Sequence, residues 1–194
     1  MARKLRVIAV VGDAAGPDGM VGGQAIDLQA AGQAPGHAVT LDAEGLRAMH
    51  ARKTGALIRA SAVSGAIMAG AADDVVFAID RYAGEVGLAF QIVDDCLDCA
   101  GQTVETGKIA GTDLREGIPT LPLLLAARED PVVRAALAGG PLEGALLRVA
   151  ASGAVDEARQ VARTYVERAR ACLEGLDTRE ELDAIADAVV ERTA

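Results

Sequence analysis

Two chemistries overlap near the middle of the chain, in the letters VDDCLDC. Three carboxylates, Asp94, Asp95 and Asp98, fall within five residues, and two thiols, Cys96 and Cys99, are interleaved with them. Carboxylate oxygens bind hard cations such as Mg²⁺, whereas paired thiols bind zinc or perform redox reactions. The helix that carries this stretch decides which chemistry the sequence favours.

The carboxylates lie at the end of a predicted helix that begins at Asp73–Asp74 and ends near Gly101. At about 100° per residue, one face of this helix is apolar, while the other is first bare and then acidic. The apolar face contains Val75, Ile79, Tyr82, Val86, Ala89, Val93, Cys96 and Leu97, and the opposite face contains Gly84, Gly87, Gln91, Asp94, Asp95 and Asp98.

A solvated acidic surface would explain most charge runs, but this one carries an energetic cost. Asp94 and Asp98 form a like-charged i,i+4 pair, which destabilises a helix by about 0.2–0.5 kcal/mol. They also lie in the last turns, where the helix dipole favours cations, and no basic residue occupies positions 90, 91, 101 or 102. A divalent cation would reverse these penalties. Because the donors are all oxygen, we expect Mg²⁺.

The thiols are less suited to chemistry. Cys96 projects onto the apolar face, where it is expected to pack as a small hydrophobic residue. A redox C-x-x-C pair normally opens a helix, where the dipole lowers the thiol pKa, whereas this pair closes one. A small dithiol or zinc protein that uses Cys96 and Cys99 remains the alternative from another functional class.

Lysines give a second line of argument, because the chain has only three of them, Lys4, Lys53 and Lys108. Lys53 and Lys108 lie beside Gly or Thr, where an ammonium group can reach a phosphate oxygen, although chance placement explains them equally well. Carboxylates, Mg²⁺ and lysines together predict a diphosphate site. His37 and His50 are expected to be a loop residue and a packed helix residue.

Composition limits the fold and the partners. The 194 residues suit one domain, and an apolar fraction of 51% with only 2% aromatics favours closely packed helices. The net charge of −9 argues against a nucleic-acid surface. No run reaches the roughly 20 apolar residues of a membrane span. With three cysteines, an odd number, no disulfide framework is implied, and a cytoplasmic location is expected.

Gly and Pro residues divide the chain into predicted helices. After two helices at 2–15 and 20–31, a long helix capped by Thr40 or Asp42 should run to about Gly70, with Leu46, Met49, Lys53, Leu57 and Val63 at helical spacing. The remaining helices are expected at 73 to about 101, 120–129, 131–138, 143–152, 154–175 and 179–192, with a loop from 102 to 117.

Four ordered segments resemble the trans-isoprenyl diphosphate synthases, also called polyprenyl synthetases. They are GMVGGQAIDL at 19–28, HARKTGALI at 50–58, GLAFQIVDDCLD at 87–98 and GKIAGTDLREGIPTLPLLLA at 107–126. The resemblance runs from about residue 17 to the end. It implies an all-α, isoprenoid synthase-type helical bundle without the family's N-terminal helices, formed by residues 1–194 as a single domain.

The resemblance also implies a prenyltransferase reaction. Mg²⁺ held between two Asp-rich motifs would bind an allylic diphosphate, and isopentenyl diphosphate would attack the allylic cation head to tail. The implied metal-site residues are Asp94, Asp95, Asp98 and, near the cluster, Asp27 with Gln24. Lys53 and Lys108 would bind the allylic diphosphate, and Thr54, Phe90 and Gln91 would lie beside the reacting carbons.

Two departures from the family pattern matter. Ile118 occupies a position where many members have a third lysine. The first Asp-rich motif and the isopentenyl diphosphate segment are expected upstream of residue 17. We therefore expect little or no activity from this chain alone, and a homodimer or a complementing subunit of a heteromeric synthase as its assembled form.

Overall fold

Within the described residues, 1–34, 39–100, 111–176 and 179–192, a computed structural model contains helices and no strand. This confirms the predicted all-α class. The elements are α1 (Ala2–Ala15), α2 (Met20–Ala30), α3 (Ala43–His50), the π-helical segment η1 (Ala51–Gly55), α4 (Ala56–Ala69), α5 (Asp73–Ala100), α7 (Thr112–Glu116), α8 (Leu121–Glu129), α9 (Pro131–Leu137), α10 (Ala145–Ala151), α11 (Ala154–Cys172) and α12 (Glu180–Val190).

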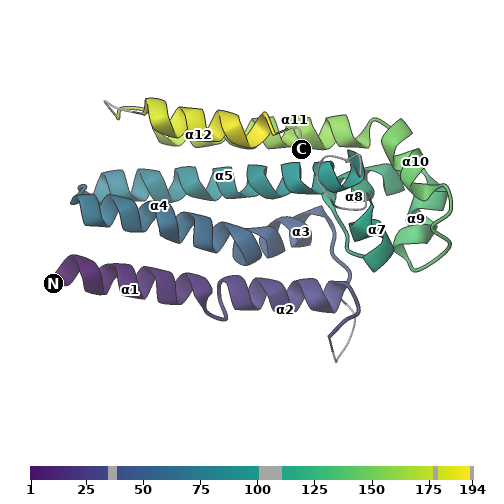
Figure 1. Cartoon of the computed structure of the whole chain (residues 1–194), viewed down its shortest axis with the longest axis horizontal. Coiled ribbons are helices and arrows are strands. Elements are labelled where there is room, and N and C mark those ends of the chain that lie inside the picture. Colours follow the sequence, from purple (N-terminus) through teal and green to yellow (C-terminus); the bar gives the residue numbers. More distant parts are fainter. Residues whose placement is uncertain (35–38, 101–110, 177–178, 193–194) are drawn as a thin grey trace.

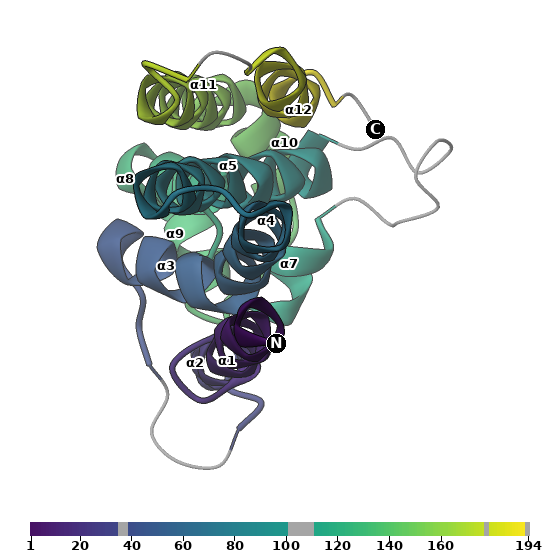
Figure 2. The same cartoon turned by 90° about the vertical axis from the view of Figure 1, so that its left-hand side faces the viewer.

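The long helices stack in layers around α5 (Figure 1). The pair α1–α2 packs on α3–α4, which packs on α5, and α11 with α12 covers the far side of α5. The short helices α7 to α10 gather at the end of the bundle where α5 finishes. Seen along the bundle in Figure 2, α5 lies between α11 and the α3–α4 layer. The acidic end of α5 is thus next to the short helices.

Local sequence signals explain where the α3–α4 layer begins and ends. The side chain of Asp42 accepts a hydrogen bond of 2.8 Å from the amide of Gly45, which caps α3 as predicted. Gly70 ends α4 with a φ of 83°, a left-handed conformation that favours glycine. The chain then turns directly into α5, so α4 and α5 pack as antiparallel neighbours.

The predicted long helix is present from 43 to 69, but it is interrupted by the π-helical segment η1. Such a segment holds one residue more per turn than an α-helix and changes the rotation of the helix after it. Leu46 and Met49 are each 2% exposed, whereas Leu57, expected on the same face, is 37% exposed. The regular spacing predicted through Leu57 was therefore wrong.

Two close backbone contacts accompany η1. A Cβ atom on Gly23 of α2 would lie 2.2 Å from the Lys53 amide nitrogen, and one on Gly87 of α5 would lie 3.1 Å from the Gly55 α carbon. Glycine thus lets both neighbouring helices approach η1 closely. These contacts fix where Lys53 and Thr54 sit.

The apolar face predicted for α5 is confirmed. Ile79, Tyr82, Val86, Ala89, Val93 and Cys96 are buried, and Val75 and Leu97 pack against the same core. Alanines on α11 bring that helix close to α5, since Ala158, Ala162 and Ala169 have no exposed surface.

The loop predicted from 102 to 117 is wrong in its last part. Thr112–Glu116 forms the short helix α7 between two left-handed glycines, Gly111 and Gly117. Five residues give too little periodicity for a sequence pattern to predict such a helix. None of the helices in the described residues is long and apolar enough to cross a membrane.

Candidate active site

An ion pair joins α2 to η1 at one side of the site. The ammonium nitrogen of Lys53 lies 2.5 Å from Oδ2 of Asp27. The Asp27 side chain is 9% exposed and that of Lys53 is 34% exposed. Gln24, one turn earlier on α2, donates a longer hydrogen bond of 3.4 Å to the same oxygen. The carboxylate therefore holds the lysine, whose charge still reaches solvent.

A chain of hydrogen bonds joins η1 to α5. The hydroxyl of Thr54 donates to Oε1 of Gln91 at 2.9 Å, and Nε2 of Gln91 donates to Oδ1 of Asp95 at 3.1 Å. The first bond orients the amide, because its oxygen must face the hydroxyl and its nitrogen must face the carboxylate. Three residues expected in the site are thus brought together.

Asp95 is the buried member of the acidic group, with 4% of its surface exposed. Its Oδ2 atom has no hydrogen-bond partner among the described residues and lies 3.9 Å from Nε2 of His50. Burial raises the pKa of Asp95 well above its usual value, and the hydrogen bond from Gln91 opposes that rise. An unpaired buried carboxylate oxygen is costly, so this atom favours a proton or a cation.

Asp98 links the end of α5 to α7. Its two carboxylate oxygens accept hydrogen bonds from the amides of Thr112 and Asp113, each at 3.2 Å. Its backbone carbonyl accepts another, at 2.8 Å, from the amide of Gly111. These contacts satisfy amides in the first turn of α7, which have no partner within that helix.

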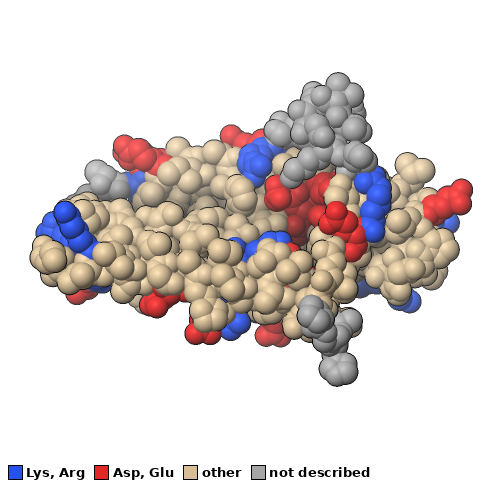
Figure 3. Space-filling model, turned by 60° about the horizontal axis from the view of Figure 1, so that its bottom comes forward, with Lys and Arg blue, Asp and Glu red and all other residues tan. Residues whose placement is uncertain are grey.

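Asp113 is a site residue that sequence reasoning missed. Burial, followed by repulsion from Asp98, Asp94 and Glu116, raises its pKa to about 7. Figure 3 shows acidic side chains gathered on one face of the molecule. Asp113 lies in the letters GTDLREG, shortly after Lys108. A sequence pattern does not show, however, that this segment packs against α5.

Arg192, just beyond α12, is a second residue that was missed. Its guanidinium carbon lies 4.7 Å from the ring centroid of Phe90, and one of its nitrogens lies 3.9 Å from Oδ1 of Asp94. The Asp94 side chain is 41% exposed. Phe90 and Asp94 therefore face the end of the chain as well as the acidic end of α5.

The donor set suits an oxygen-seeking cation, but the carboxylates are not arranged around one point. Across the described residues, no three or more His, Cys, Asp or Glu side chains form a group that could hold a metal. Burial first, and then neighbouring carboxylates, raise the pKa of Asp113, and one oxygen of Asp95 is buried without a partner, so positive charge would be favourable beside both. The residues therefore fit a divalent cation in type and charge. Lys108, the other predicted diphosphate ligand, lies outside the described residues.

The thiols are poorly suited to metal or redox chemistry. Cys96 and Cys99 are free and buried. Burial, followed by a neighbouring carboxylate, raises the pKa of each thiol to about 12, with Asp95 acting on Cys96 and Asp98 on Cys99. Since the thiolate is the form that binds metals and attacks disulfides, the dithiol alternative loses its chemical basis.

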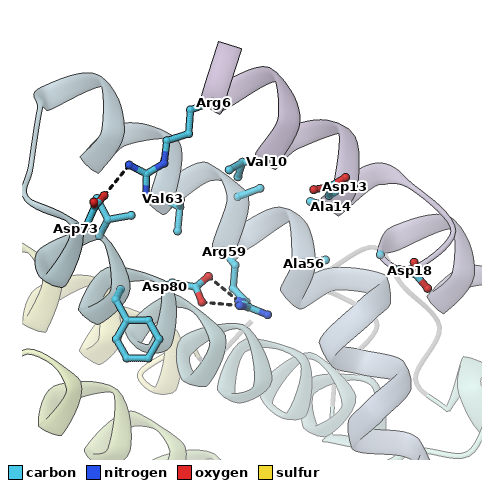
Figure 4. Close-up of a pocket in the computed structure, with 14 residues that line it drawn as sticks. Arg6, Val10, Asp13, Ala14, Asp18, Ala56, Arg59, Val63, Asp73 and Asp80 are labelled. Carbon is cyan, nitrogen blue, oxygen red and sulfur yellow. Dashed lines mark hydrogen bonds and ion pairs between the residues drawn. The ribbon is translucent and has the colours of Figure 1, made fainter. Parts of the chain in front are cut away.

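A groove with a volume of about 550 Å³ runs between α1, α4 and α5, with Ala56 at the start of α4 among its lining residues (Figure 4). Val10, Ala60, Val63 and Val76 contribute apolar surface. Its charged residues are partly paired: Arg59 donates two hydrogen bonds to Asp80, of 2.9 and 2.5 Å, and Arg6 lies 2.7 Å from Asp73.

Comparisons with known proteins show which family the chain resembles. The polyprenyl synthetase family model matches residues 2–139. Farnesyl diphosphate synthase of Escherichia coli (strain K12) is 38% identical over 190 residues, which cover 97% of this chain and 54% of that protein.

Solved structures show the same similarity. The polyprenyl synthase from Caulobacter crescentus CB15, complexed with calcium and isoprenyl diphosphate, has a TM-score of 0.78 and 32% identity over 100% of this chain and 58% of that one. The geranylgeranyl pyrophosphate synthase from Corynebacterium glutamicum, complexed with isoprenyl diphosphate and magnesium, has a TM-score of 0.76 and 27% identity. The match covers 97% of this chain and 54% of that one. The chain spans little more than half the length of each of these three relatives.

Proposed function

This chain belongs to the polyprenyl synthetase family, and from that premise we propose that it supplies one half of a prenyltransferase active site. The reaction is the head-to-tail condensation of isopentenyl diphosphate with an allylic diphosphate. The observation that carries the proposal is the linked set Lys53–Asp27 and Thr54–Gln91–Asp95, which brings an ammonium group and a buried carboxylate to opposite sides of η1.

Lys53 binds the allylic diphosphate in this proposal. Asp27 orients its ammonium group while a third of the lysine side chain remains exposed to solvent. An ammonium group has three donors, so one can stay with Asp27 while the others turn to phosphate oxygens. Lys108 is proposed to act on the same diphosphate.

Asp94, Asp95 and Asp98, joined by Asp113, are the residues that would hold Mg²⁺. When bound, Mg²⁺ supplies positive charge that stabilises the departing diphosphate. The Asp94 side chain is 41% exposed, whereas Asp95 is buried, so Asp94 is the more accessible of these two carboxylates to a cation. Asp98 keeps α7, and with it Asp113, against the end of α5.

Thr54, Gln91 and Phe90 orient the reacting carbons. The Thr54–Gln91 hydrogen bond fixes the amide between η1 and α5. The groove lined by Ala56, Ala60 and Val63 of α4 offers apolar side chains from α1, α4 and α5 to a hydrocarbon tail. Free thiols fit a reducing compartment, so we place the reaction in the cytoplasm.

We also propose that the chain acts in an assembly that supplies further carboxylates. Several large apolar side chains of α1 and α2 are exposed, including Leu5 at 57%, Ile8 at 67% and Val21 at 53%. A patch of this kind is typical of a protein interface. A synthase subunit that the chain complements would cover it and bring the first Asp-rich motif, whereas a second copy of the chain would cover it without bringing that motif.

The test compares the chain alone with the chain joined by a partner that carries the first Asp-rich motif. Condensation of labelled isopentenyl diphosphate with geranyl diphosphate in Mg²⁺ is expected to be near background for the chain alone and restored by the partner. In the complex, Lys53→Met should weaken geranyl diphosphate use at least about tenfold. Asp94→Asn should reduce turnover by about 10²-fold or more.

Two matched variants serve as controls. Lys4→Met removes another lysine and Asp74→Asn another carboxylate of α5, both far from the site in sequence, and both complexes should keep full activity. Appreciable condensation by the chain alone would overturn the half-site proposal. Equal losses from Lys4→Met and Lys53→Met would overturn the role of Lys53.

A further inference from the structure

A second pocket, with a volume of about 250 Å³, lies on the other side of the acidic helix, where α3, α5, α8 and α11 meet. Around α5, its lining residues Leu88 and Ile92 are rotated by roughly 120° from Asp94 and Asp98. Asp94 and Asp98 thus face away from this pocket, whereas Asp95, rotated by roughly 20–60° from Leu88 and Ile92, lies closer to it. Six side chains form most of the inner wall: Leu46, His50, Leu88, Ile92, Leu121 and Tyr165.

The inner wall is apolar except for one imidazole and one phenol. His50 is 5% exposed, and its Nε2 atom lies 3.9 Å from Oδ2 of Asp95, beyond hydrogen-bond distance. A neutral imidazole has one donor and one acceptor nitrogen.

The mouth of the pocket carries no net charge. Glu44 and Arg47 are the charged residues that line it, and they lie 3.9 Å apart as an exposed i,i+3 pair. The interior thus offers nothing that would balance the charge of an ionic ligand. An apolar pocket with one convergent polar group is the usual form of a small-molecule site.

We propose that this pocket binds a small, uncharged, mainly apolar molecule that carries one hydroxyl group. The hydroxyl exchanges a hydrogen bond with the imidazole of His50, and the hydrocarbon part packs against Leu88 and Ile92. The volume equals that of roughly eight water molecules, which excludes a peptide helix of about 10 Å diameter. Apolar walls leave such waters short of partners, so a hydrocarbon group is the better occupant.

The occupant would lie one side chain away from Asp95. His50 separates the pocket from the unpaired Oδ2 atom of that carboxylate. A ligand that holds the His50 ring in place would therefore also fix the group that lies next to the Asp95 carboxylate. Binding in the pocket does not depend on the proposed prenyltransferase reaction, and it can be measured without diphosphate or metal.

The experiment uses the whole chain with ¹³C-labelled Ile, Leu and Val methyl groups and three probes of equal size class: 4-methylphenol, toluene and 4-methylbenzoate. In NMR titrations, 4-methylphenol should shift the methyl signals of Leu46, Leu88 and Ile92. It should bind about threefold to tenfold more tightly than toluene, the gain expected for one hydrogen bond. The carboxylate 4-methylbenzoate should not bind.

Two variants locate the site. Ile92→Trp should fill the pocket and abolish the shifts, whereas Leu147→Trp, at a position 77% exposed on α10, should leave them unchanged. His50→Leu should make 4-methylphenol and toluene bind equally. Should a pocket variant fail to fold by circular dichroism, contacts between the ligand and the His50 ring in nuclear Overhauser spectra of the unaltered chain decide the matter.

Three outcomes overturn the proposal. The first is the absence of methyl shifts with 4-methylphenol. The second is equal binding of toluene and 4-methylphenol to the unaltered chain, which would remove the role of His50. The third is binding of 4-methylbenzoate as tight as that of 4-methylphenol, which would contradict an uncharged ligand.

Discussion

Gly23 packs directly against the backbone of Lys53, so that a Cβ on the glycine would lie 2.2 Å from the lysine amide nitrogen and 2.6 Å from its α carbon. Real side chains do not approach backbone atoms this closely. Because α2 and η1 cross at this point, Asp27, one turn further along α2, reaches the lysine ammonium. The position of Lys53 thus depends on the absence of a side chain at Gly23 of α2.

Gly23→Ala should therefore separate α2 from η1. We expect a loss of about 2–3 kcal/mol in the free energy of unfolding, as for an overpacked core, measured by urea denaturation. Gly12→Ala is the matched control, because nothing lies within 4 Å of its added Cβ and the site is in a helix. That variant should gain up to about 1 kcal/mol. Equal effects of the two substitutions would contradict the close crossing.

Lys53→Met should expose the dependence of Asp27 on its partner. The carboxylate would remain buried without its cation, and we expect a loss of about 2 kcal/mol in urea denaturation, less than for a fully buried pair because Lys53 is a third exposed. Arg6→Met breaks an ion pair whose partners are 50% and 86% exposed and should cost at most about 0.5 kcal/mol. A Lys53→Met cost as small as that of Arg6→Met would mean that the hydrogen bond from Gln24 is enough to satisfy the Asp27 carboxylate.

The acidic cluster should make stability fall as the pH rises. The pKa of Asp113, about 7 in the folded chain because of burial and nearby carboxylates, exceeds its ordinary value of 3.8. The folded state thus holds this proton between about pH 4 and 7, and the stabilisation is lost as the pH rises through 7. His50, whose pKa is lowered to about 3 by burial, acts in the opposite direction below pH 6.5.

The variant Asp113→Asn isolates the carboxylate from the histidine. Relative to the unaltered chain, it should gain stability on the order of 1 kcal/mol between pH 5 and pH 7.5, after allowance for partial exposure. Urea denaturation at both pH values measures this difference, with the exposed Asp18→Asn as the matched substitution. A pH-independent difference would show that Asp113 ionises normally in the fold.

The three thiols should differ in reactivity. Burial raises the pKa of Cys96 and of Cys99 to about 12, whereas Cys172 is partly exposed. In the native chain at pH 8, we expect one thiol to react readily with Ellman's reagent and the other two to react only after unfolding in urea. Cys172→Ser should remove the native reaction. Rapid native labelling of Cys96 or Cys99 would revive the dithiol alternative.

Helix positions were largely predictable, because their signals are local. Asp42 as a cap, Gly70 as a terminator and the apolar face of α5 all follow from neighbouring residues, and the structure confirms them. The π-helical segment was not predicted from neighbouring residues, and it lies in close contact with Gly23 and Gly87 on other helices. The helix α7 was missed for a similar reason, as its first amides bond to Asp98 of α5.

The sequence predicted which residues form the candidate site better than it predicted which of them contact one another. Resemblance and helical spacing identified Lys53, Thr54 and Gln91, but not the partners of these residues. Asp27, expected near a metal, lies against Lys53, and Asp95, expected on an acidic face, is buried. Both results depend on contacts between residues far apart in sequence. The metal and substrate roles of these residues stay predictions.

The turn formed by Ala51–Gly55 also makes the site sensitive to length. Deleting any one of these five residues would allow an unbroken α-helix, and the segments before and after it would then differ by about 100° from their present relative rotation. His50 and Lys53 could not then both keep their present neighbours, even though each side chain was retained. In this turn, the number of residues matters as much as their identity.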